Sequence, residues 1–150
     1  MKFKVIIISL LISAGYLYWK HNVTTEPYID PALQIFTNEW KTELDNAGIS
    51  YEAGFNRIDN IILTSDSEVS AHFDIASRTI MISIAQMERG EFSTRAAIWH
   101  ELGHYVFRLE HSDGIMNSYS LSEDSYINDW ARLKNEYLIK CIKNEWNGKI

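Results

Sequence analysis

Apolar positions with helical spacing predict the first element of the domain. Asp30-Pro31 is typical of an N-cap followed by proline at the first helical position, and Gly48 is expected to end the helix. The apolar face recurs every three or four residues, at Leu33, Phe36, Trp40 and Leu44. We therefore expect an amphipathic helix that packs on a core.

The next part of the chain changes to short β-prone runs. These predict strands at 58–64, 71–75 and 79–84, the last two joined as a hairpin. Helical spacing then returns. Ser93 is expected as the N-cap of a helix at 94–109, Gly114 marks a turn, and Glu123-Asp124 opens a final helix. This order predicts a single α+β domain with a small mixed sheet, a motif-bearing helix and a C-terminal helix.

Residues 1–20 have a different pattern. Lys2 and Lys4 precede an uncharged run at 5–19, and Lys20 closes it. Fifteen residues are fewer than the about 20 that usually span a bilayer. They match the upper limit of roughly 7–15 for the apolar region of a signal peptide. Aromatic side chains that suit a membrane interface gather at its far end: Tyr16, Tyr18 and Trp19.

This pattern divides the chain into a signal-anchor or signal peptide (1–20), a polar tether (21–29) and a domain (30–150). We expect export. The domain would be membrane-anchored outside the cytoplasm, periplasmic or extracellular, or secreted if the signal is cleaved. The first twenty residues hold three Lys and no acid, so the other 11 basic and 20 acidic residues give a net charge of −9. Nucleic acid is therefore not an expected partner.

The sequence His-Glu-Leu-Gly-His, from His100 to His104, carries the candidate chemistry. Two histidines four residues apart lie one turn apart on one helix face, where both can bind one Zn²⁺. Glu101 points about 100° away around the axis, so it can take a proton from metal-bound water rather than bind the metal. An apolar stripe is expected on the opposite side: Ile98, Leu102, Tyr105, Val106 and Leu109.

Together with His111 and Ile115-Met116, this motif resembles the metzincin clan, most closely its matrixin-like branch with small bacterial members. The resemblance covers about 80–137. It implies a zinc-dependent endopeptidase in which His100, His104 and His111 are ligands of one catalytic Zn²⁺. It also implies that Glu101 is the base and Met116 the Met-turn residue beneath the metal. The strand at 80–84 would then hold a peptide or protein substrate by edge pairing.

The spacing departs from the common metzincin pattern. That pattern has Gly three residues after the second His and the third His three residues later. Phe107 and Glu110 occupy these positions, and His111 lies eleven residues after His100. The chain is therefore expected to leave the helix with another geometry.

Two alternatives to this interpretation stay open. In a gluzincin-like peptidase, as in the thermolysin-like enzymes, Glu123 would replace His111 as the third ligand. In a non-catalytic zinc-binding or interaction protein, the metal would serve only structure. Tyr119 and Tyr126 are candidates to stabilise an oxyanion, and ordinary packing is the alternative for each.

The remaining candidates have simpler interpretations. Cys141 cannot form an internal disulfide and is expected in the core, and His72 is expected in the core or at the surface. The sequence leaves a calcium requirement open, since three acids form no recognisable calcium loop: Asp66, Glu68 and Asp74.

Overall fold

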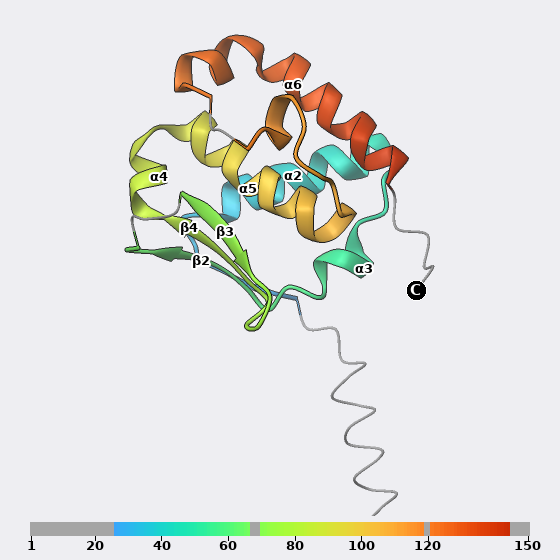
Figure 1. Cartoon of the computed structure of the whole chain (residues 1–150). Helices are drawn as coiled ribbons and strands as arrows, with labels where there is room; N and C mark the ends of the chain where they lie inside the picture. Colours follow the sequence, from blue (N-terminus) through green and yellow to red (C-terminus); the bar gives the residue numbers. More distant parts are fainter. Residues whose placement is uncertain (1–25, 67–69, 119–120, 145–150) are drawn as a thin grey trace, which may run out of the picture.

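The computed structural model describes residues 26–66, 70–118 and 121–144 (Figure 1). The expected signal-anchor, most of the tether and Tyr119 lie outside these residues. In the described ranges, no helix combines the length and apolar character needed to cross a membrane.

A four-stranded mixed sheet forms one layer, in the order β1-β2-β4-β3. Parallel pairing joins β1 (Tyr28–Ile29) to β2 (Asn60–Thr64), and β2 to β4 (Thr79–Ser83). The last strand, β3 (Ala71–Asp74), is antiparallel to β4. The predicted α+β class and the hairpin are confirmed.

The sheet corrects two expectations. Residues 28–29, expected in the tether, form β1. The strand expected to pair with substrate at an edge, 80–84, forms most of β4, which lies between β2 and β3. Pairing with a strand on each side defines this central position, and the full burial of Ile80 and Ile82 agrees with it. Among the described strands, the sheet edge next to β4 is β3.

The helices are α2 (Gln34–Ala47), α3 (Glu52–Phe55), α4 (Ile84–Glu88), α5 (Glu91–Phe107) and α6 (Glu123–Lys143), with the 3-10 turn η1 (Gly114–Met116) before α6. Gly48 ends α2 in the left-handed conformation (φ 68°), as its position predicts. The helix α5 begins earlier than expected. Gly90 is its N-cap residue, and Ser93 lies buried in its first turn.

Helices α2, α5 and α6 stack on one face of the sheet, with α5 between the sheet and α6 (Figure 1). Aromatic side chains join the three. The Tyr137 hydroxyl on α6 accepts a hydrogen bond from Trp40 Nε1 on α2 (2.9 Å) and donates to the Trp99 carbonyl on α5 (2.9 Å). These hydrogen bonds of Tyr137 fix the position of α5, which carries the candidate site.

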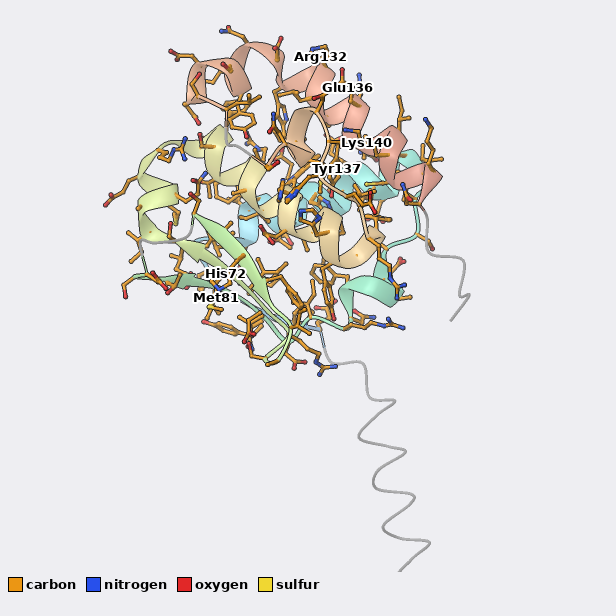
Figure 2. All side chains as sticks on the ribbon, in the orientation of Figure 1. His72, Met81, Arg132, Glu136, Tyr137 and Lys140 are labelled. Carbon is orange, nitrogen blue, oxygen red and sulfur yellow. The ribbon has the colours of Figure 1, made fainter. Side chains whose placement is uncertain are left out.

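In the sheet, His72 on β3 pairs in register with Met81 on β4 (Figure 2).

Candidate metal centre

The three predicted metal ligands lie together. His100 and His104 are one turn apart on α5, with ring centroids 4.5 Å apart. The His111 ring, from the segment after α5, lies 5.2 Å from His100 and 4.6 Å from His104. One potential ligand atom from each residue lies within 4.8 Å of the other two. Nitrogens bound tetrahedrally at 2.0–2.1 Å would be about 3.3 Å apart, so small side-chain movements suffice to bind one zinc ion.

Backbone carbonyls orient the two helical imidazoles. His100 Nδ1 lies 2.8 Å from the Ile115 carbonyl oxygen, and His104 Nδ1 lies 2.5 Å from that of Leu109. A carbonyl oxygen only accepts, so each neutral ring carries its proton on Nδ1. Both Nε2 atoms then keep their lone pairs, yet they are only 2.9 Å apart. Two facing lone pairs at this distance repel unless a cation lies between them, so the donor set fits a metal ion.

The end of α5 explains how His111 reaches the other two histidines. Arg108 leaves the helix in the left-handed conformation (φ 55°, ψ 35°), and the Leu109 N–H donates to the Gly103 carbonyl (3.1 Å). A glycine usually occupies such a position. Here the helix continues through Phe107, and the chain reverses direction at Arg108, one residue later than at the glycine of the common pattern. The third histidine is also one residue later.

Met116 lies directly against α5. It is fully buried, and a Cβ atom built on Gly103 would lie 2.7 Å from its sulfur atom and 3.1 Å from Tyr137 Cε2. The missing side chain at Gly103 therefore makes room for Met116 and Tyr137 against the helix. This packing places η1, and with it the Ile115 carbonyl, beside the histidines.

Glu101 is a buried carboxylate on the helix that carries the two histidines. Its side chain lies on α5 between the two histidines in sequence and is 9% exposed. Within the described part of the chain it has no hydrogen bond or ion pair, and burial raises its pKa to about 7. Burial likewise lowers the pKa of His100 to about 4, which keeps the imidazole neutral at neutral pH.

The segment after His111 is held by contacts that the sequence did not predict. Lys140 on α6 donates to Ser112 Oγ (2.9 Å) and to the Asp113 carbonyl (2.6 Å), and Figure 2 labels it on that helix. The Ser112 N–H donates to the Met116 carbonyl (2.9 Å). Lys140 gives no local signal in the sequence, since its partners lie about 27 residues away.

The other candidate residues lie elsewhere. Glu123 accepts hydrogen bonds from the N–H groups of Phe92 (2.9 Å) and Ser93 (2.6 Å), at the start of α5. Tyr126 is buried, and its hydroxyl accepts from the Leu121 N–H (3.3 Å). Cys141 is fully buried, as expected for a core residue. The histidine cluster contains none of these side chains.

Comparison of the chain with protein families, with curated proteins and with solved structures gives no match. The function is therefore inferred from the geometry of the site.

Proposed function

We propose that the protein is a zinc-dependent endopeptidase with His100, His104 and His111 as the metal ligands. The observation that carries the proposal is the pair of facing Nε2 atoms, 2.9 Å apart, with His111 completing the group. Three protein ligands leave a fourth position open, which is typical of catalytic rather than structural zinc sites.

A zinc ion held there would supply a Lewis acid that polarises a carbonyl group and acidifies water. Glu101 takes the proton of the attacking water and passes it to the leaving amine. Its carboxylate suits this role because no structural contact among the described residues occupies it. A purely structural zinc site has no use for such a base.

Within the zinc peptidases, we propose a metzincin-like arrangement. The reversal at Arg108 accounts for the longer spacing to His111, and Met116 packs under the helix that carries the two histidines. The gluzincin-like alternative requires Glu123 at the metal, but its carboxylate is bound to backbone N–H groups at the other end of α5.

An extended peptide would pair with β3. This strand bonds to β4 on one side, and on its other side the described residues provide no strand. Its residue Phe73 contacts Tyr105, the neighbour of His104. Main-chain pairing along β3 would therefore bring a substrate past the histidines.

The test is zinc content and hydrolysis by the full chain purified in detergent. We expect one zinc per chain and cleavage of an unfolded protein that a chelator abolishes. A chain without transition metal, or with equal cleavage in the presence of the chelator, would refute the proposal. Zinc binding without cleavage would favour a non-catalytic zinc protein.

Replacement of the proposed base separates catalysis from metal binding. Glu101→Gln should keep zinc and lose hydrolysis by a factor of about 10²–10⁴, since only proton transfer is removed. Glu88→Gln, an exposed position on α4, is the matched control and should leave both unchanged. Loss of zinc in Glu101→Gln would instead make Glu101 a ligand.

A further inference from the structure

A groove of about 370 Å³ borders the histidine cluster, between the end of β3, α3 and the end of α5. His104 forms part of its wall. The other residues that define its chemistry are Arg57, Phe73, Ile75, Tyr105, Val106 and Arg108. The groove thus joins the candidate metal centre to the sheet edge at β3.

The apolar side of the groove comes from β3 and α5. The Phe73 and Tyr105 rings are in contact, with centroids 4.1 Å apart, and Val106 is buried. Ile75, in the turn after β3, is 81% exposed. A peptide side chain entering here would cover Ile75 and the edges of both rings, and burial of this apolar surface would favour binding.

The charged side of the groove is cationic. Arg57 and Arg108 both line it, and no acidic residue does so in the described part of the chain. Because the chain beyond residue 20 carries a net charge of −9, two arginines here form a local exception that would attract a carboxylate.

We infer that this groove is a substrate subsite for an aromatic or large aliphatic side chain that neighbours Asp or Glu. The inference rests on the proposed peptidase function. A peptide paired along β3 passes Phe73 and Ile75 before it reaches His104, so its side chain meets the apolar wall and an adjacent carboxylate meets the arginines. An anionic membrane surface has similar chemistry, but continuity of the groove with His104 favours the peptide.

The experiment uses the full chain in detergent and peptides with Phe-Glu, Phe-Lys, Ser-Glu or Ser-Lys moved through the positions flanking the cleaved bond. At one of these positions, kcat/KM for the Phe-Glu peptide should be about tenfold higher than for the Phe-Lys peptide, because its KM is lower. Arg57→Glu and Arg108→Glu should each reverse that preference, and Ile75→Asp should reduce the preference for Phe over Ser. Lys143→Glu, an exposed charge reversal on α6, should change neither.

Equal cleavage of all peptides, or equal losses for all of them in the arginine variants, would overturn the subsite.

Fluorescence anisotropy with the Glu101→Gln chain separates the two proposals. Selective binding of Phe-Glu without hydrolysis by the unsubstituted chain would support the groove and reject the peptidase. A fluorophore attached at position 75 of Ile75→Cys tests whether the groove binds a membrane instead. The other cysteine, Cys141, is buried, so the label should attach at position 75. Insertion of this fluorophore into vesicles that contain anionic lipid would also overturn the subsite.

Discussion

His111 is the exposed member of the three histidines, and its position depends on the segment that follows α5. Its ring lies beside both helical rings, whereas Glu123 is occupied at the start of the helix. The third ligand is therefore the residue at which the metzincin-like and gluzincin-like interpretations differ most.

We predict that His111→Ala lowers zinc affinity steeply, because it removes one of the three proposed ligands. Glu123→Ala should leave zinc affinity almost unchanged. Competitive titration with a chromogenic chelator measures both, with His72→Ala on the sheet as the matched histidine control. Near-normal affinity in His111→Ala together with a collapse in Glu123→Ala would reverse the assignment.

At the residue scale, the sequence indicated which histidines come together better than it indicated the contacts that hold them. The helical spacing of His100 and His104 places both on one face whatever the rest of the fold does. The carbonyls that orient these rings belong to Leu109 and Ile115, and a backbone acceptor leaves no mark in the sequence. The packing at Gly103 was also missed, since its partner Tyr137 lies on another helix.

At the level of elements, the end of α5 stores backbone strain. Arg108 holds a positive φ that costs a residue with a Cβ about 1–2 kcal/mol. Arg108→Gly should therefore raise the free energy of unfolding by about 0.5–1 kcal/mol and keep zinc binding, because the reversal is preserved. Urea unfolding measures the change. Arg89→Gly is the control. Arg89 ends α4 at φ −73°, where glycine relieves no strain, so this variant should be less stable than the unsubstituted chain.

The start of α5 is capped by a side chain from α6. Burial alone would raise the pKa of Glu123, but the hydrogen bonds from Phe92 and Ser93 and the nearby Arg95 outweigh it and lower the pKa below the ordinary value of a glutamate. The stabilisation is therefore complete above the unfolded pKa and is lost as pH falls through the folded pKa.

We predict that Glu123→Ala lowers the free energy of unfolding by about 1 kcal/mol near neutral pH. The difference from the unsubstituted chain should shrink as pH falls below about 4.5. Unfolding curves across this range measure it, and Asp124→Ala, the exposed neighbour, is the control. A difference that does not change with pH would mean that the charge of Glu123 does not cap α5.

The long helices and the strands β2, β3 and β4 were predicted well, and the two shortest elements, α3 and β1, were not. The spacing and Gly48 identified α2, whereas α3 has four residues and β1 only two, too few to give a period. The error at the start of α5 has a physical reason. Ser93 has the side chain of an N-cap, but Glu123 accepts the Ser93 N–H from outside the helix. The central position of β4 depends on pairing across the sheet, which no local pattern encodes.

For the whole molecule, the location of the domain is still a prediction. Lys2 and Lys4 at the start of the apolar segment should stay in the cytoplasm, which would place residues 21–150 outside. An epitope tag after Ile150 should then be removed by protease added to cells with an intact plasma membrane, while a cytoplasmic marker survives. Protection of the tag would contradict the orientation.

The first described strand has a mechanical consequence. Because β1 runs parallel to β2, tension on the chain before Tyr28 pulls β1 lengthwise along its neighbour. Under a pull along the strand axis, the hydrogen bonds from Tyr28 N–H to the Asp59 carbonyl and from Asp30 N–H to the Ile61 carbonyl would bear the load together in shear. A domain held at a surface by its leading segment and pulled along this axis would be loaded first at this two-residue strand.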